Sequence, residues 1–258
     1  MSSLRDGHRF LIPASRRLTW DLLWFNRDVP LCGHDRRMSL GVVREVRDAC
    51  PVRIGWPVLF LKAMALVARD IPQFRQTWYR WPLAHLYQHP ESIASITVHR
   101  ELNGEPWLFW GILHSPETRS LESLQKQIDA YRTEDVAKVF RRQWHLAKLP
   151  TLFRRALWWW NLNVAAKKRA TRLGTFFVST LAGRGTEIQV PPSVHTCCLT
   201  YGPLDEQQTA RVTMAYDHRV MDGSLIAHAL EKLEATLNGT IADELRLVNA
   251  TDRSRTAA

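Results

Sequence analysis

The sequence has only four cysteines, and none of them is placed to bind a metal ion or to form an evident disulfide. Cys32 and Cys50 are isolated, whereas Cys197 and Cys198 are adjacent in a stretch that we expect to be a strand. Adjacent residues of a strand point to opposite faces of the sheet, so these two thiols should not bond to each other. The sequence therefore predicts no metal site, and reduced thiols of the kind found in cytoplasmic proteins.

Long hydrophobic runs are also missing. The most apolar stretches, 56–68 and 156–166, are shorter than the ~20 apolar residues that cross a bilayer. The first residues, Met1 to Gly7, are polar, so we expect no secretory signal. No internal repeat or interdomain linker is evident. With 258 residues, 45% of them hydrophobic, the chain suits one mixed α/β domain over 1–241, followed by a polar tail at 242–258.

The most informative residues are the seven from Asp217 to Gly223, which read Asp-His-Arg-Val-Met-Asp-Gly. The run from Thr209 to Tyr216 alternates apolar and polar residues and predicts a strand before this motif. Apolar residues at helical spacing predict a helix after it, which Ser224 can cap. On the turn between them, His218 can act as a general base near neutral pH, and Gly223 permits a tight turn.

This motif resembles the catalytic signature of the acyltransferase component of 2-oxo-acid dehydrogenase complexes, the dihydrolipoyl transacylases, which belong with chloramphenicol acetyltransferase. A second segment, Gly174 to Leu181, reads Gly-Thr-Phe-Phe-Val-Ser-Thr-Leu. It resembles the stretch of the same family that carries an oxyanion-stabilising serine, and Ser179 is the matching position. Similarity of lower specificity begins near Ile12 to Arg17 and extends to about residue 238, and Val190 stands where the family has an asparagine.

The resemblance implies a chloramphenicol-acetyltransferase-like fold of the α/β (α+β) class, a mixed β-sheet flanked by helices, with its active site at a trimer interface. It implies that His218 is the general base and that Ser179 stabilises the oxyanion. Asp222 resembles a family aspartate that pairs with an arginine near the N-terminus, for which Arg16 and Arg17 are candidates. Coenzyme A or acyl-coenzyme A is then a substrate, and neither a permanently bound cofactor nor a metal is expected.

This chain has no lipoyl-lysine motif, so we expect a free-standing catalytic domain. It would transfer an acyl group between a coenzyme A or carrier thioester and a thiol, alcohol or amine acceptor, as a homotrimer in the cytoplasm or peripherally at the membrane. The alternative is a catalytically silent trimeric scaffold or a membrane-surface binding module. The presence of both Ser179 and His218 favours the enzyme, because a scaffold needs neither.

Acidic residues are absent from the basic section, residues 139–172, which is rich in arginine, lysine and tryptophan. Its helices could cover a core with their aromatic rings and leave the charge in water. They could lie on an anionic membrane surface, or attract an anionic donor such as acyl-coenzyme A or an acyl-carrier protein. Nucleic acid fits poorly, because no recognised binding motif accompanies the charge. Since consecutive helical residues lie about 100° apart, at least one of Trp158, Trp159 and Trp160 should pack inward.

Overall fold

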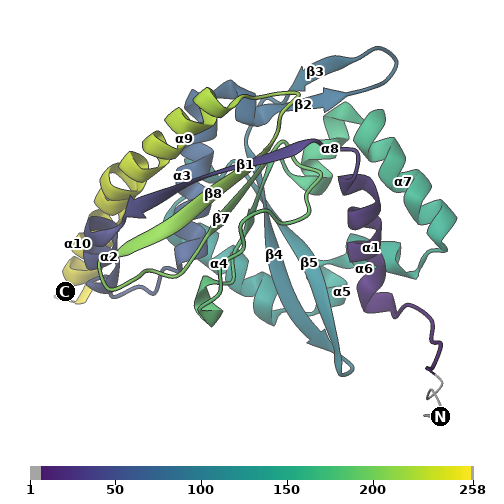
Figure 1. Cartoon of the computed structure of the whole chain (residues 1–258). Helices are drawn as coiled ribbons and strands as arrows, with labels where there is room; N and C mark the ends of the chain where they lie inside the picture. Colours follow the sequence, from purple (N-terminus) through teal and green to yellow (C-terminus); the bar gives the residue numbers. More distant parts are fainter. Residues whose placement is uncertain (1–6, 257–258) are drawn as a thin grey trace, which may run out of the picture.

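A six-stranded mixed sheet forms the centre of the computed structural model, which describes residues 7–256 (Figure 1). The start of the chain, on which the expectation of no secretory signal rests, lies outside the described residues, as do the last two residues. In spatial order the strands are β1 (Leu31–Ser39), β8 (Thr209–Asp217), β7 (Cys197–Tyr201), β6 (Phe176–Ser179), β4 (Ile93–Leu102) and β5 (Glu105–His114). β6 is parallel to both of its neighbours, and the other pairs are antiparallel. The predicted mixed sheet flanked by helices is confirmed.

Several elements agree with the sequence pattern. The sequence Asn103-Gly104 is typical of a two-residue hairpin turn, and β4 and β5 form a hairpin that turns there, with positive φ angles at both residues. The adjacent Cys197 and Cys198 lie in β7 and belong to different hydrophobic clusters, as strand alternation requires. A separate two-stranded sheet pairs β2 (Gln76–Tyr79) with β3 (His85–Gln88).

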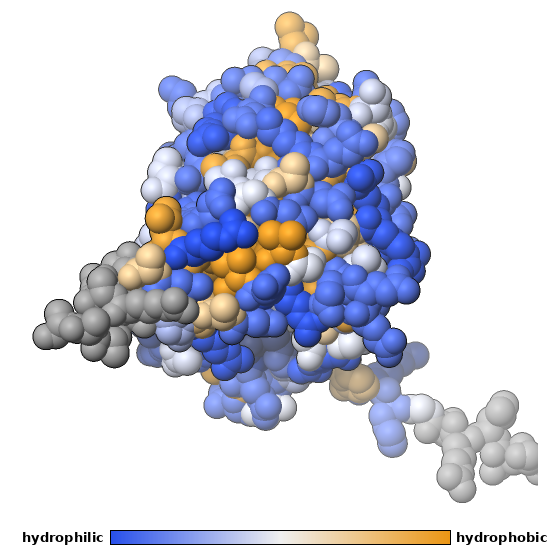
Figure 2. All heavy atoms as spheres, turned by 90° about the vertical axis from the view of Figure 1, so that its left-hand side faces the viewer, coloured by the Kyte–Doolittle hydropathy of each residue, from blue (hydrophilic) through white to orange (hydrophobic). Residues whose placement is uncertain are grey.

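The main hydrophobic core lies on one face of the sheet, around α3 (Trp56–Asp70). This helix is apolar on nearly all sides, so it has to be covered all round by other elements. It contacts the helices α4 (Leu121–Thr133) and α9 (Gly223–Thr236) and the strands β4 and β6. The remaining cover on this side comes from α2 (Gly41–Asp48), the π-helical turn Leu237–Ile241 and α10 (Ala242–Thr256). Figure 2 shows this side of the molecule, which is mainly hydrophilic with a small hydrophobic area near its centre.

The predicted polar tail at 242–258 is wrong, because the chain continues as α10 to Thr256. Ala242 and Leu245 are fully buried in the main core, and Lys62 Nζ of α3 lies 2.5 Å from Glu244 Oε2. A few apolar contacts and one largely buried ion pair therefore extend the domain beyond residue 241. The polar composition of the segment hid them.

The opposite face of the sheet is covered near β4, β5 and β6 by the first helix and by the basic section. These helices are α1 (Ala14–Asn26), α6 (Arg141–Lys148), α7 (Thr151–Asn163) and α8 (Ala166–Leu173); the short α5 (Val136–Val139) precedes them and packs with the main core. Trp158 is buried in a small cluster with Leu22 and Phe25 of α1, whereas Trp159 and Trp160 are exposed. The prediction that at least one of the three tryptophans packs inward is confirmed. No helix in the described part of the chain is long and apolar enough to cross a membrane.

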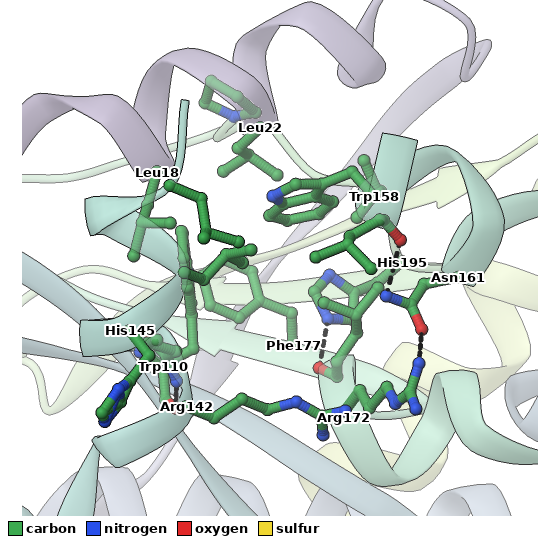
Figure 3. A pocket seen from close by; sticks show the side chains of 17 residues that line it. Leu18, Leu22, Trp110, Arg142, His145, Trp158, Asn161, Arg172, Phe177 and His195 are labelled. Carbon is green, nitrogen blue, oxygen red and sulfur yellow. Dashed lines mark hydrogen bonds between the residues drawn. The ribbon is translucent and has the colours of Figure 1, made fainter. Parts of the chain in front are cut away.

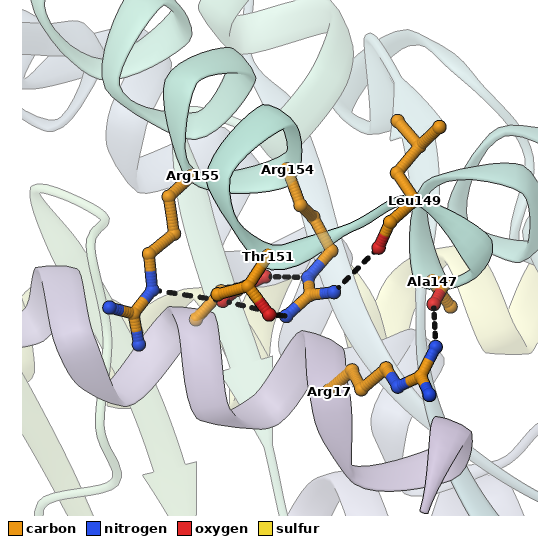
Figure 4. Close-up of polar contacts among 7 residues, drawn as sticks. Arg17, Ala147, Leu149, Thr151, Arg154 and Arg155 are labelled. Atoms are coloured by element: carbon orange, nitrogen blue, oxygen red, sulfur yellow. Dashed lines mark hydrogen bonds and ion pairs between the residues drawn. The ribbon is translucent and has the colours of Figure 1, made fainter.

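A buried ion pair joins α7 to α1 (Figure 4). Arg154 donates to both oxygens of the Asp21 carboxylate, and the two side chains are 1% and 0% exposed. A third nitrogen of Arg154 donates to the Leu149 carbonyl oxygen over 2.9 Å. Arg155 Nε lies 3.4 Å from the same carboxylate, and its guanidinium lies 4.0 Å from the Trp24 ring. Part of the charge of the basic section therefore holds the fold together and does not face solvent.

Replacing Asp21 with asparagine should cost about 3–5 kcal/mol of unfolding free energy, because the Arg154 charge is then buried without a counter-charge. The double variant Asp21→Leu/Arg154→Met, which removes both charges, should lose less than the single variant. Chemical denaturation measures both, with Lys168→Met, an exposed change in the same section, as the control. A single variant within about 1 kcal/mol of wild type would show that the pair is not structural.

Candidate active site

The turn that carries His218 is held by side-chain hydrogen bonds at the end of β8. The buried Asp217 carboxylate accepts hydrogen bonds from Arg219 Nε at 2.8 Å and from Arg219 Nη2 at 2.6 Å. The Arg219 guanidinium also lies 4.1 Å from the Trp78 ring. The backbone N–H of His218 donates to the Pro30 carbonyl oxygen over 3.2 Å. The backbone of the turn is thus fixed while the His218 side chain is exposed, as a group that meets a substrate or a second subunit must be.

A column of aromatic rings lies beside His218. The Tyr216 ring is 5.5 Å from the His218 ring and 5.5 Å from the His34 ring of β1. The Tyr216 hydroxyl is buried and has no hydrogen-bond partner among the described residues. Burial, and then the neighbouring Cys32 thiol, raise the pKa of Tyr216 to about 12, so its proton is retained at neutral pH. Strand alternation places Tyr216 on the same face as His218. The sequence could therefore have predicted that Tyr216 lies beside His218, although the motif alone did not.

Gly223 serves a different purpose from the one predicted. Its φ is not among the positive values of the described glycines, so the turn does not need glycine for its backbone conformation. A Cβ at this position would lie 3.1 Å from His34 Nε2, closer than a carbon atom ordinarily packs. A side chain at this position would therefore require the ring of His34 to shift by a few tenths of an ångström at the start of α9.

Asp222 also has a different role from the one predicted. Its carboxylate accepts a hydrogen bond from the Leu225 N–H over 2.9 Å and caps α9, so the cap is Asp222 and not Ser224. No ion pair joins Asp222 to Arg16 or Arg17 within the described chain, in which α1 packs against α6 and α7 and Arg17 donates to the Ala147 carbonyl oxygen.

Asp222→Asn should therefore leave the unfolding free energy nearly unchanged, because asparagine caps helices about as well as aspartate. Asp222→Ala should cost about 0.5–2 kcal/mol, the range for loss of an N-cap. Urea denaturation of the two variants distinguishes this role from an ion pair. A loss of about 3–5 kcal/mol in Asp222→Asn would instead indicate a buried partner arginine.

Ser179 lies at the end of β6, on the face of the sheet opposite the main core. It is 7% exposed, and its Oγ is 3.3 Å from Thr97 Oγ1 of β4. The strand register continues this row of polar side chains through Thr200 of β7, Thr213 of β8 and Asp35 of β1. Ser179 is therefore one member of a polar row that crosses five strands.

The segment after Ser179 folds over the same face. Thr200 Oγ1 donates to the Gln189 carbonyl oxygen over 3.2 Å. Val190 packs against Gly33 of β1, where an added Cβ would lie 2.9 Å from Val190 Cγ2. Val190, which replaces the asparagine of the family pattern, thus makes an apolar contact with β1.

Within one chain, Ser179 and His218 do not meet. Ser179 is paired with Thr200, and Thr200 is paired with Thr213, which precedes His218 by five residues. Strands rise about 3.3 Å per residue and lie about 4.8 Å apart, which separates Ser179 from His218 by roughly 20 Å. A general base acts over a hydrogen-bond distance of about 3 Å. The two residues can share a site only if they come from different chains.

Two buried histidines lie near the other end of this face. His195 stacks on Phe177 with ring centres 5.2 Å apart, and its Nε2 lies 2.6 Å from the Leu173 carbonyl oxygen. Burial lowers the pKa of His195 to about 4, and burial followed by the Arg169 charge lowers the pKa of His89 to about 4. Both rings are therefore neutral at pH 7. Among the described residues, no group of three or more His, Cys, Asp or Glu side chains could hold a metal ion.

The unfolding free energy should fall as the pH is lowered from about 6.5 to about 4, because the unfolded chain takes up protons on His195 and His89 that the folded chain does not. Urea denaturation at about pH 7 and about pH 4.5 measures this loss, which should be at least about 1 kcal/mol. His195→Gln should show a smaller loss over the same range. An equal loss in the variant would show that other groups cause the acid sensitivity.

No family model matches the sequence, and no curated protein matches it. Solved structures do match. A dihydrolipoamide acetyltransferase from Azotobacter vinelandii is similar over 92% of this chain and 94% of that chain, with 16% identity and a TM-score of 0.64. A truncated catalytic core of the 2-oxoacid dehydrogenase multienzyme complex from Thermoplasma acidophilum covers 90% of this chain and 99% of that chain, with 12% identity and a TM-score of 0.66. A chloramphenicol acetyltransferase covers 84% of this chain and 94% of that chain, with 15% identity and a TM-score of 0.51.

In the Azotobacter protein, a serine, a histidine and an asparagine were investigated for their role in the catalytic mechanism, and the asparagine follows the histidine by four residues. His218 and Asp222 have the same spacing here. The resemblance found in the sequence is thus confirmed at the level of the fold: this chain has the chloramphenicol-acetyltransferase-like fold of the dihydrolipoamide acetyltransferase catalytic cores.

Proposed function

We propose that the protein is an acyltransferase that moves an acyl group between a coenzyme A or carrier thioester and a thiol, alcohol or amine acceptor. The observation that carries this proposal is the pair of motif residues in this fold: Ser179 ends β6, and His218 follows β8 on a clamped turn. The likeness to acetyltransferase cores over about nine-tenths of the chain supports the assignment.

We further propose that the active site forms between two subunits of a homotrimer, where Ser179 of one chain faces His218 of its neighbour. The separation of these residues within one chain supports this arrangement, because neither can assist the other there. The exposed His218 ring is free to reach across such an interface.

In the proposed reaction, the acceptor attacks the thioester carbon while His218 takes the acceptor's proton. The carbonyl oxygen becomes an oxyanion, to which the Ser179 hydroxyl donates a hydrogen bond. The intermediate then collapses: the carbon–sulfur bond breaks, the acyl group stays on the acceptor, and the departing thiolate takes the proton from His218. Coenzyme A is in this scheme a substrate, and Asp222 contributes by capping the helix that follows the turn.

Two further features bear on where the protein works. The described cysteines all have free thiols, which supports a reducing compartment such as the cytoplasm. Leu152, Phe153 and Trp160 of α7 are exposed beside basic residues, which favours contact with an anionic membrane surface. A silent scaffold or membrane-binding module would use only these exposed residues of α7, and it would not need Ser179 or His218.

His218→Ala should lower turnover by about 10²–10⁴, and Ser179→Ala by about 10²–10³, because each removes one transition-state contact. Acyl transfer is followed with a free-thiol reporter against a series of acyl-coenzyme A donors. Melting temperature is the control for folding. Wild-type turnover in both variants would contradict the roles proposed for His218 and Ser179. No acyl transfer by the wild type with any donor would instead favour the silent scaffold.

Mixing the two inactive variants should restore activity, because a trimer assembled from both chains contains some sites with an intact Ser179 and an intact His218 from different subunits. The variants are unfolded together, refolded and assayed, with each variant refolded alone as the control. If the wild type is active and the refolded mixture is not, both residues act within one chain.

A further inference from the structure

A cavity of about 320 Å³ lies between the basic section and the sheet (Figure 3). Leu18 and Leu22 of α1 and Trp158 of α7 line one side of it, and Trp110 of β5 and Phe177 of β6 line the sheet side. These side chains are apolar and come from both helical segments and the sheet. The cavity thus has the concave, mainly apolar lining that is typical of small-molecule sites.

The cavity lies next to Ser179 on the same face of the sheet. Phe177 precedes Ser179 by two residues in β6, so the two side chains point the same way. Trp110 is paired with Thr97, whose hydroxyl oxygen is 3.3 Å from Ser179 Oγ. A molecule that fills the cavity would therefore have one end beside Phe177, which is two strand residues, about 7 Å, from the candidate catalytic serine.

Two arginines without acidic partners line the same cavity. Arg142 of α6 and Arg172 of α8 run along one edge of it (Figure 3). Arg172 donates to the amide oxygen of Asn161, and neither arginine has a carboxylate partner among the described residues. Burial, and then the charge of Arg172, lower the pKa of Arg142, which places the two cations near each other. Such a pair is stabilised when an anion lies between its members.

The lining also contains a buried polar group with no partner. Trp158 is 5% exposed, and its indole Nε1 has no hydrogen-bond acceptor among the described residues. A buried donor left without an acceptor costs about 1–3 kcal/mol. A bound molecule that carries an oxygen atom could satisfy this N–H as well as the arginines.

From this arrangement we propose that the cavity binds an amphiphilic carboxylate, a medium-length acyl chain whose apolar part lies among Leu22, Trp158 and Phe177 and whose anionic group lies between Arg142 and Arg172. The inference concerns binding and does not depend on the proposed acyl transfer. The position beside Ser179 would make the same cavity suitable for the acyl group of a substrate. The chemistry is that of a fatty acid or of another apolar body with one carboxylate.

The volume of the cavity limits the length of the acyl chain that it can hold. An apolar cavity of about 150 Å³ holds one benzene molecule, so 320 Å³ has room for roughly twelve carbon atoms. Decanoate is therefore a suitable probe. Decanol has the same chain without the charge, and decylamine has the same chain with the opposite charge.

The test is isothermal titration calorimetry of the full-length protein with these three compounds. We expect decanoate to bind at one site per chain, decanol to bind more weakly, and decylamine to bind least. The double variant Arg142→Gln/Arg172→Gln should weaken decanoate at least about tenfold, the effect of losing one charge-assisted hydrogen bond, and should leave decanol unchanged. Leu146 of α6 also lines the cavity. Leu146→Trp, which would fill part of the cavity, should weaken the binding of both decanoate and decanol.

The matched control is Lys167→Gln/Lys168→Gln, which removes two exposed charges from the same section and should bind decanoate like wild type. Melting temperatures verify that each variant is folded. Equal loss in this control would attribute the effect to the general positive charge and overturn the proposal. So would wild-type binding in the arginine variant, or no saturable binding of decanoate. His218→Ala should bind decanoate normally, so failure of the proposed catalysis and failure of this site give different results.

Discussion

The backbone hydrogen bonds between β6, β7 and β8 fix the positions of both candidate catalytic side chains. Because Ser179, Thr200 and Thr213 share one register, His218 must lie about five strand residues away from the serine in the same chain. Side-chain rotation cannot close a gap of roughly 20 Å between them. If both residues take part in one reaction, the protein has to bring two chains together, and the exposed His218 on its clamped turn suits that requirement.

The basic section has an interior role as well as a surface role. Arg154 is buried against Asp21, and Arg169 donates to the Leu162 and Val194 carbonyl oxygens. These contacts hold α7 and α8 against the rest of the fold and so help to form the walls of the cavity, while Arg142 and Arg172 keep no carboxylate partner among the described residues. Because 139–172 contains no acidic residue, Arg142 and Arg172 have no counter-charge within the basic section, and both line the cavity.

The parts of the fold that local sequence determines were predicted correctly. The alternation before His218 and the helical spacing of apolar residues after Gly223 depend on neighbours in the chain. β1 was not predicted. Among the described residues it pairs only with β8, and most of its side chains are at least partly exposed, which removes the alternating pattern.

The site was predictable only where a motif marked it. The motif identified Ser179 and His218, but it assigned Asp222 to an arginine of α1, and that helix packs elsewhere. The cavity could not be predicted, because its lining comes from α1, α6, α7, α8 and two strands that are distant in sequence. Tertiary packing decides which residues line one wall of the cavity, and the hydrophobic periodicity of a single helix or strand does not show it.

The central claim is that the active site is completed by a second subunit. The most direct test is to measure specific acyl-transfer activity and oligomeric mass together over a dilution series, by assay and by analytical ultracentrifugation. The proposed arrangement predicts a trimer whose activity per chain falls in the same concentration range in which it dissociates. A monomer with full activity per chain would contradict it.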